Sequence, residues 1–261
     1  MKFMDSTKIY RYMSFERFSE ILFNKELAFI SPSRWNDKFE MTFSEELKLF
    51  KNALLIEEMA DNKGVSFRES YDALEEMVNE INKETFCLCF SRNKDSEVMW
   101  NSYGNGNDTI MIRTSIDKIV NIDPENIYPI RVCYDLGKRS IEKWLEDCDF
   151  YKNRIMVTED YQTFIGHKRK CFSYENELRI VANSHSKKVI RYDEVNKIIY
   201  FRIDDLAYYI ENVIVNPLAS DGYTRLIKNM CKHFGIRFGG RSKVYEFDIK
   251  QLDKGWNLSI Y

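Results

Sequence analysis

The start of the chain carries two different hydrophobic patterns in succession. Residues 7–13 alternate between polar and apolar side chains, which is typical of a strand. Ser14 then stands at the N-cap of an amphipathic helix that ends at about Asn24, and a second short strand is expected at residues 27–30. The pattern therefore predicts a strand, a helix and another strand.

An acidic segment follows at residues 40–84, with twelve acids and five bases. Its apolar positions recur at helical spacing, interrupted at residues 62–64. The second half opens with a capping box, in which Ser66 is followed three residues later by Glu69. We expect a helical hairpin of about residues 44–82, inserted between strands.

From residue 85 onward the pattern is mostly that of strands. Residues 86–91 form a nearly continuous apolar run, which predicts a buried central strand, and Asp95 is the expected N-cap of a short helix. Further strands are expected at 109–113, 128–134, 178–182, 188–192, 197–201, 212–215 and 243–249, and helices at 140–150, 159–170 and 221–234. Because no repeat or linker divides these elements, we expect one mixed α+β domain over residues 1–261.

The composition is that of a folded protein, with 44% hydrophobic and 31% charged residues, ten glycines and four prolines in 261 residues. No apolar run approaches the ~18 residues that a membrane-spanning helix needs. We therefore expect a cytoplasmic protein without membrane contact. The six cysteines form no paired CxxC module, and the three histidines show no ligand spacing, so reduced thiols and no metal site are expected.

Several common catalytic motifs are absent from the sequence: GxGxxG after a strand, GxxxxGK[ST], HExxH and GxSxG. The Rossmann, P-loop, zincin and α/β-hydrolase classes therefore lose their main support. The formal net charge is −2, yet residues 222–245 hold six bases and no acid. This stretch is either a solvated face or a surface for an anionic partner.

The segment 174–180 carries the most informative constellation, because it holds two glutamates and an arginine at alternate positions. In a strand, Glu175, Glu177 and Arg179 share one face. Two carboxylates at this spacing repel each other unless a cation or a substrate lies between them. Paired carboxylates suit glycosyl transfer, in which one stabilises a cationic centre and the other takes a proton. The alternative is an ordinary strand face on which Arg179 neutralises both acids.

The chain also resembles a widespread bacterial domain-of-unknown-function family along almost its whole length. The landmarks are, in order, Tyr10-Arg11-Tyr12, Asn36-Asp37-Lys38-Phe39-Glu40, Cys89-Phe90-Ser91, Met99-Trp100 with Tyr103, and Tyr174-Glu175-Asn176-Glu177-Leu178-Arg179. That family is in turn similar to the Arg-Ser-Glu class of ADP-ribosyltransferases, which bind NAD in the cleft of a split mixed β-sheet. One departure is Phe90, where the class carries a threonine hydroxyl.

The resemblance implies a role for each matched residue. Arg11 would bind the phosphates and ribose of NAD through charge-assisted bonds. Ser91 would contact the nicotinamide-side ribose and orient the catalytic acid. Glu177 would stabilise the oxocarbenium ion as nicotinamide leaves, and Glu175 would position or deprotonate the acceptor.

Four further residues complete the expected NAD site. Tyr12 lies beside Arg11 in the first landmark. Trp100 and Tyr103 could stack on nicotinamide or adenine, or serve equally well as core anchors. Asn36 is expected to line the cleft, although Asn-Asp is also ordinary turn chemistry.

The function implied by the resemblance is NAD-dependent ADP-ribosyl transfer to a macromolecular acceptor, either protein or nucleic acid. NAD is then a substrate, and no metal is involved. Such enzymes occur in bacterial toxin and antiphage systems, which allows an inhibitor or antitoxin protein as a further partner. Two alternatives stay open: an NAD glycohydrolase, and a non-catalytic nucleotide-binding or sensor domain.

Overall fold

The computed structural model describes residues 3–35, 37, 83–104, 106–134, 165–166 and 168–246. The expected helical hairpin at about 44–82 and the expected helix at 140–150 lie outside these residues. Asn36 also lies outside them.

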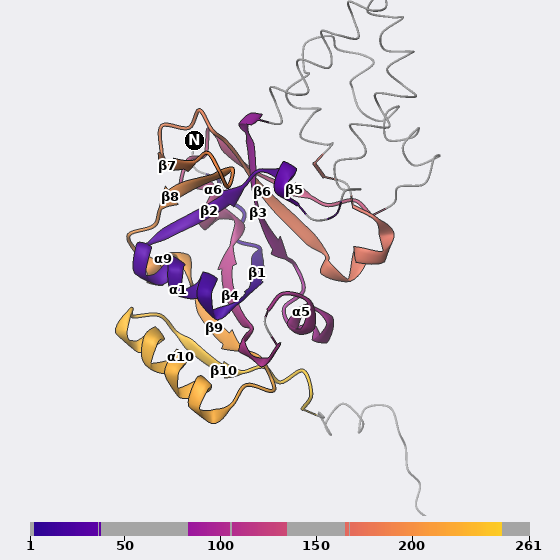
Figure 1. The fold of residues 1–261 in the computed structure, drawn as a ribbon, viewed down its shortest axis with the longest axis vertical. Coiled ribbons are helices and arrows are strands. Elements are labelled where there is room, and N and C mark those ends of the chain that lie inside the picture. The colour runs from indigo at the N-terminus through magenta and orange to yellow at the C-terminus, as the bar shows by residue number, and fades with distance from the viewer. Residues whose placement is uncertain are drawn as a thin grey trace, which may run out of the picture.

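Ten strands of the described chain join into one mixed sheet, which confirms the α+β class (Figure 1). Their bounds are β1 Lys8–Met13, β2 Glu26–Ile30, β3 Thr85–Ser91, β4 Ile110–Ser115, β5 Ile127–Arg131, β6 Glu177–Asn183, β7 Val189–Asp193, β8 Ile198–Arg202, β9 Asn212–Val215 and β10 Phe238–Arg241. The order is β10-β9-β4-β1-β3-β2-β8-β7, and β6 pairs with both β3 and β5. Only β9 and β10 pair in parallel, and the other described pairs are antiparallel.

Strand pairing is extensive in some parts of the sheet and limited to single residue pairs next to β3. β3 pairs with β6 over seven residues, from Thr85 to Ser91, and β1 pairs with β4 over six. In contrast, β1 and β3 meet at a single pair, Tyr10 with Ser91, and β2 and β3 meet only at Ile30 with Cys87. Because β6 pairs with β3 along its whole length, β1 and β2 share the other edge of β3, and the backbone separates along that edge.

Five α-helices and three 3₁₀ turns accompany the sheet in the described residues. Their bounds are α1 Phe15–Asn24, α5 Glu97–Ser102, α6 Ile116–Val120, α9 Leu206–Tyr209 and α10 Asp221–His233, with η1 Pro32–Arg34, η3 Gly106–Asp108 and η5 Lys170–Glu175. Ser14 caps α1 as expected, because its Oγ accepts a hydrogen bond from the amide of Arg17 at 3.4 Å. No described helix is long and apolar enough to cross a membrane.

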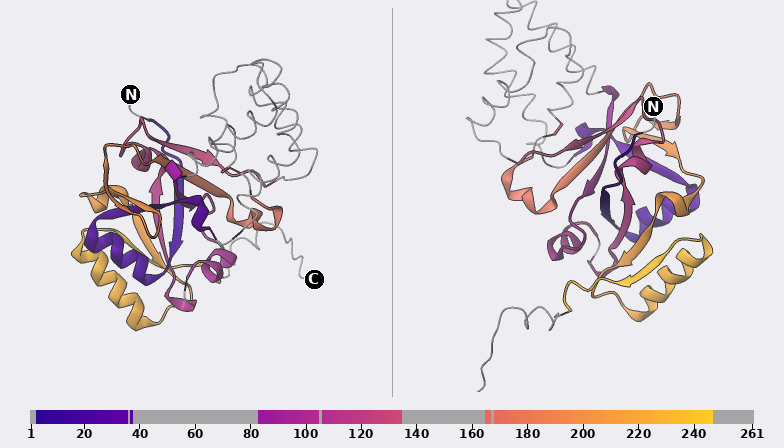
Figure 2. Two further views of the ribbon diagram at one scale, coloured as in Figure 1. Left: turned by 45° about the horizontal axis from the view of Figure 1, so that its top comes forward. Right: turned by 180° about the vertical axis from the view of Figure 1, so that it is seen from behind.

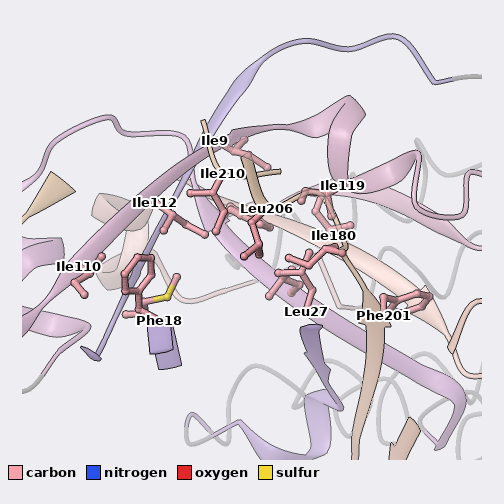
Figure 3. Close-up of a cluster of buried hydrophobic side chains, with 14 of the residues drawn as sticks. Ile9, Phe18, Leu27, Ile110, Ile112, Ile119, Ile180, Phe201, Leu206 and Ile210 are labelled. Atoms are coloured by element: carbon pink, nitrogen blue, oxygen red, sulfur yellow. The ribbon is translucent and has the colours of Figure 1, made fainter. Parts of the chain in front are cut away.

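The main core lies on the face of the sheet that α1 and α10 cover (Figure 3). Phe18 of α1 and Ile227 of α10 are fully buried there. The two helices also lie side by side (Figure 2). The ring of Phe23 in α1 lies 5.3 Å from that of Phe234, which follows the last residue of α10. A second, smaller core on the opposite face packs Tyr10 and Tyr12 of β1 against α5.

Three expectations about elements are wrong. Residues 243–246 form a turn, and the last described strand is β10, five residues earlier than expected. Residues 165–166 form a turn and Lys170 begins η5, so the described part of the expected helix 159–170 is not α-helical. Finally, Ser96 and not Asp95 occupies the N-cap position of α5. The Asp95 carboxylate accepts hydrogen bonds from Trp100 Nε1 at 2.6 Å and Ser242 Oγ at 2.8 Å instead.

Candidate functional site

A cleft of about 580 Å³ opens where β1 and β3 separate. It brings together six residues of the predicted set, contributed by β1, β3, α5, η5 and β6: Arg11, Tyr12, Ser91, Tyr103, Glu175 and Glu177. Trp100 is only 1% exposed and belongs to the smaller core beside the cleft, where its ring lies 4.9 Å from that of Tyr12. Tyr103, at 39% exposed, lines the cleft.

The charge of the cleft differs in sign from that of the whole chain. The described lining residues include four cations, Arg11, Arg34, Lys168 and Arg169, and three carboxylates, Asp37, Glu175 and Glu177. The whole chain has a net charge of −2. A cleft with an excess of positive charge favours an anionic ligand.

Arg11 occupies the gap in the sheet. Strand alternation places it on the same face of β1 as Ile9 and Met13, which belong to the main core. Its guanidinium nevertheless lines the cleft on the other face, and Nη1 donates to the carbonyl oxygen of Cys89 at 2.6 Å. This is geometrically allowed because β1 and β3 pair at one position only. Burial lowers the pKa of Arg11, but a guanidinium stays protonated at neutral pH.

Glu175 and Glu177 are separated by a turn, which corrects the expectation that both lie in one strand. Glu175 ends η5, Asn176 is in the left-handed conformation with φ 43°, and Glu177 begins β6. Ser91 Oγ donates to the carbonyl oxygen of Glu175 at 2.7 Å and accepts from the amide of Asn93 at 3.0 Å. The buried serine hydroxyl thus anchors the turn that carries the two carboxylates.

The carboxylate of Glu177 lies among cations. Arg179 Nε donates to its Oε1 at 3.0 Å, and Lys168 Nζ donates to its Oε2 at 3.2 Å. Burial alone raises the pKa of Glu177, but the charges of Arg179 and Lys168 prevail and lower this pKa to about 2. The backbone is held as well, because the amide of Glu177 donates to Tyr134 Oη at 2.7 Å. Glu177 is therefore a fixed and ionised carboxylate at neutral pH.

Glu175 lies in a different electrostatic environment, although it shares a cation with Glu177. Lys168 Nζ donates to Glu175 Oε2 at 2.6 Å, and the Tyr103 hydroxyl also hydrogen-bonds this carboxylate. Burial nevertheless raises the pKa of Glu175 above its ordinary value, and these hydrogen bonds offset it only in part. The two carboxylates of the pair thus have pKa values displaced in opposite directions, a pattern typical of sites that need two acid-base roles.

Lys168 is the contact that the sequence interpretation missed. Its backbone amide donates to the carbonyl oxygen of Cys133 at 3.0 Å, and the amide of Cys133 donates to Gly166 at 2.7 Å. This pairing brings Lys168 next to the carboxylates, and its ammonium also lies 4.9 Å from the ring centre of Phe172. The cation expected between two close carboxylates is therefore Lys168, while Arg179 contacts Glu177 from the other side.

Two further arginines organise the walls of the cleft. Arg179 is fully buried, hydrogen-bonds the carbonyl oxygen of Ile165 and stacks over the ring of Trp35 at 4.1 Å. Arg169 donates to Asp37 Oδ2 through Nε at 3.1 Å and Nη2 at 2.9 Å. These contacts connect Trp35 at the end of η1, and Asp37, to the side of the cleft formed by η5 and β6, which carry the two glutamates.

The described part of the chain contains no group of three or more His, Cys, Asp and Glu side chains that could hold a metal ion. Cys87 and Cys89 both line the cleft. Burial raises the pKa of Cys89 well above its ordinary value, and the neighbouring Glu177 acts in the same direction. Cys89 is thus an unreactive thiol at neutral pH.

Residues 99–180 match the model of a family described as a protein of unknown function, DUF2971. This match confirms the resemblance to a domain-of-unknown-function family. It includes the landmarks at Met99-Trp100 and at residues 174–179. No curated protein matches the sequence.

Among solved structures, the chain is similar to DarT from Thermus sp. 2.9. The complex of that protein with ADP-ribosylated ssDNA is 11% identical, with a TM-score of 0.38, over 95% of this chain and 100% of that chain. The complex with NAD+ is 10% identical, with a TM-score of 0.38, over 94% of this chain and 100% of that chain. The complex with carba-NAD+ has the same identity and coverage and a TM-score of 0.37.

Proposed function

We propose that this protein is an NAD-dependent ADP-ribosyltransferase whose active site is the cleft between β1 and β3. The observation that carries the proposal is the convergence of Arg11, Glu175 and Glu177 in one cleft, from segments far apart in the sequence. These are the arginine and the glutamate pair of the Arg-Ser-Glu pattern. The opening of the sheet around β3 is in keeping with the split-sheet cleft of that class.

The cleft suits NAD in size and charge. Its volume of about 580 Å³ lies within the range of small-molecule sites, ~300–1,000 Å³. The excess of cations favours the diphosphate, and Arg11 supplies a planar guanidinium of the shape that binds phosphate oxygens. Tyr103 and Tyr12 add aromatic surface for the bases.

Glu177 is assigned to the bond-breaking step. The bond between ribose C1′ and the nicotinamide nitrogen breaks, nicotinamide leaves with the electron pair, and positive charge develops on the ribose. A carboxylate that is ionised and fixed before the reaction stabilises this charge without reorganising. Arg179 and Lys168 hold Glu177 in that state.

Glu175 is assigned to the acceptor. A carboxylate whose pKa is raised is a better proton acceptor than an ordinary glutamate, and Glu175 lies within the same cleft. Ser91 is assigned a positioning role, because its hydroxyl donates to the backbone of Glu175. We also propose that Ser91 contacts the ribose of NAD directly, as the resemblance to the Arg-Ser-Glu class implies.

The resemblance supports a role in toxin or antiphage systems and an inhibitory partner protein. The sequence pattern and composition support a single domain over residues 1–261, an inserted helical hairpin and a cytoplasmic location. The acceptor is a macromolecule, either protein or nucleic acid.

Incubation with NAD, alone and with cell extract, tests the proposed function. Release of nicotinamide together with a labelled macromolecule supports transfer. Release without any labelled product identifies an NAD glycohydrolase, and NAD binding without release identifies a sensor domain. If the protein neither binds NAD nor releases nicotinamide, all three functions are contradicted.

A further inference from the structure

The space between the two carboxylates is already filled by a cation of the chain itself. Lys168 Nζ lies 2.6 Å from Glu175 Oε2 and 3.2 Å from Glu177 Oε2, and its side chain is only 7% exposed. The ammonium is held in place by the backbone pairing of Lys168 with Cys133 and by the ring of Phe172. Lys168 is therefore a structural part of the site.

This arrangement changes what the carboxylate pair can bind. Without Lys168, two carboxylates on the floor of a cleft would attract a cationic side chain or amine. With Lys168 and Arg179 present, two cations balance the charges of Glu175 and Glu177. A second ammonium or guanidinium next to Glu175 would meet the ammonium of Lys168 at short range, and juxtaposed like charges are strongly unfavourable in a desolvated site.

We propose that Lys168 is a specificity-determining residue that excludes cationic acceptors, so that the acceptor nucleophile is uncharged before it reacts. This inference rests on the proposed function. Hydroxyl, amide and neutral ring-nitrogen groups satisfy it, whereas guanidinium and ammonium groups do not. In the transfer step the acceptor lone pair forms the bond to ribose C1′, the bond to nicotinamide breaks, and the acceptor proton passes to Glu175.

The test uses agmatine, a small guanidinium compound, as the acceptor probe with labelled NAD. Wild-type protein should form no agmatine adduct while it releases nicotinamide. Lys168→Met removes the charge at similar length. Because a repulsive element is lost, this variant should raise the ratio of adduct to released nicotinamide to at least about ten times the background of an incubation without protein. Lys168→Arg keeps the charge and should behave as wild type. The matched control is Lys170→Met, an exposed lysine two residues later.

An agmatine adduct formed by wild-type protein as readily as by Lys168→Met would overturn the proposal. So would a folded Lys168→Met protein that releases nicotinamide but gains no adduct. If Lys168→Met does not fold, the result with wild-type protein decides. An agmatine adduct formed by wild type contradicts the exclusion. Release of nicotinamide by wild type without an agmatine adduct supports it.

Calorimetric titration with agmatine separates this proposal from the proposed function. If no protein releases nicotinamide, the proposed transfer has failed, but binding still decides the role of Lys168. Agmatine bound by Lys168→Gln and not by wild type supports exclusion by charge. Equal binding, or binding by neither protein, contradicts it.

Discussion

At the scale of single residues, Arg179 distinguishes the two glutamates. Lys168 donates to both carboxylates, whereas Arg179 donates to Glu177 through Nε at 3.0 Å and through Nη2 at 3.3 Å. The additional charge is what lowers the pKa of Glu177, whereas burial prevails at Glu175. Two neighbouring residues of the same type thereby acquire different chemistry.

Replacing Glu177 with glutamine should reduce nicotinamide release by ~10²–10³-fold, the effect of losing one electrostatic stabiliser of a transition state. The variant removes the negative charge at nearly constant volume. The substitution also leaves the buried cations Lys168 and Arg179 with one carboxylate fewer, so the stability of the variant should fall. The rates are therefore compared per folded molecule, with the folded fraction measured by circular dichroism. Glu194→Gln, in an exposed turn, is the control. A wild-type rate in folded Glu177→Gln would remove Glu177 from the mechanism.

Arg11→Ala should weaken NAD binding. A charge-assisted hydrogen bond contributes ~1.5–3 kcal/mol, so the dissociation constant should rise by roughly 10- to 150-fold in calorimetric titration. Arg237→Ala removes an exposed arginine outside the cleft and should leave NAD affinity unchanged. If Arg11→Ala and wild type bind NAD with equal affinity, Arg11 has only a structural role at the gap in the sheet.

The two reactions should differ in their response to acid. A base with a raised pKa becomes protonated first as the pH falls, so transfer should decline at a pH above the ordinary glutamate range, ~4.3. Nicotinamide release needs ionised Glu177, whose pKa is about 2, and should persist to lower pH. Both rates are measured across one pH series. Glu175→Gln should depress transfer more than release at the pH values at which wild-type Glu175 is ionised, and the difference should disappear in acid. A parallel decline of both reactions in wild type would refute this division of roles.

At the scale of elements, the link between η5 and β6 depends on one residue in a left-handed conformation. Asn176 has φ 43° and ψ 53°, and its Nδ2 donates to Asn93 Oδ1 at 3.0 Å. Asn176→Gly and Asn176→Ala both lose that hydrogen bond, but only alanine is strained at this φ. Alanine should therefore be less stable than glycine by ~1 kcal/mol in urea denaturation. Equal stability of the two variants would show that the backbone has relaxed.

The sequence predicted most described strands because most of them bury one or both faces. The apolar run at 86–91 and the alternation at 7–13 correspond to β3 and β1. β10 was missed because its Phe238-Gly239-Gly240-Arg241 sequence carries no alternation. α6 and α9 were also missed, since helices of five and four residues are too short to show a 3.6-residue period.

The site could be predicted in part, and the limit is physical. Glu175 and Glu177 were identified from a local motif, and Arg11 and Ser91 from the resemblance to a known class. The structure brings all four to one cleft. Lys168 was not identified, because its position depends on a backbone pairing with Cys133, more than thirty residues away in sequence. Local periodicity contains no information on such a contact.

At the scale of the whole molecule, the basic face of α10 and the cleft lie on opposite sides of the sheet. Arg225, Lys228 and Lys232 are exposed, while Ile227 and Cys231 of the same helix enter the main core. The cleft lies on the other face, where Met99 of α5 is one of its lining residues. The basic stretch therefore does not line the cleft.

Reversing Arg225, Lys228 and Lys232 together to glutamate should leave nicotinamide release and acceptor labelling unchanged. All three side chains are exposed and none of them lines the cleft, so their charge should not affect the chemistry. Labelling assays at low and high salt provide the measurement. Loss of labelling of RNA or DNA, with release intact and a steep salt dependence, would instead identify α10 as a docking surface for nucleic acid.

The gap between β1 and β3 also determines how the native protein should open. The β1–β4 ladder of six pairs and the β3–β6 ladder of seven are joined by one pair, so their amides should exchange hydrogen as separate cooperative units. A ligand that contacts Arg11 on one ladder and Glu177 on the other links the two units. A non-hydrolysable NAD analogue should then slow exchange in β1 and β6 to a similar extent, because binding stabilises both through the same mass action. Slower exchange in one ladder alone would mean that the ligand does not bridge the gap.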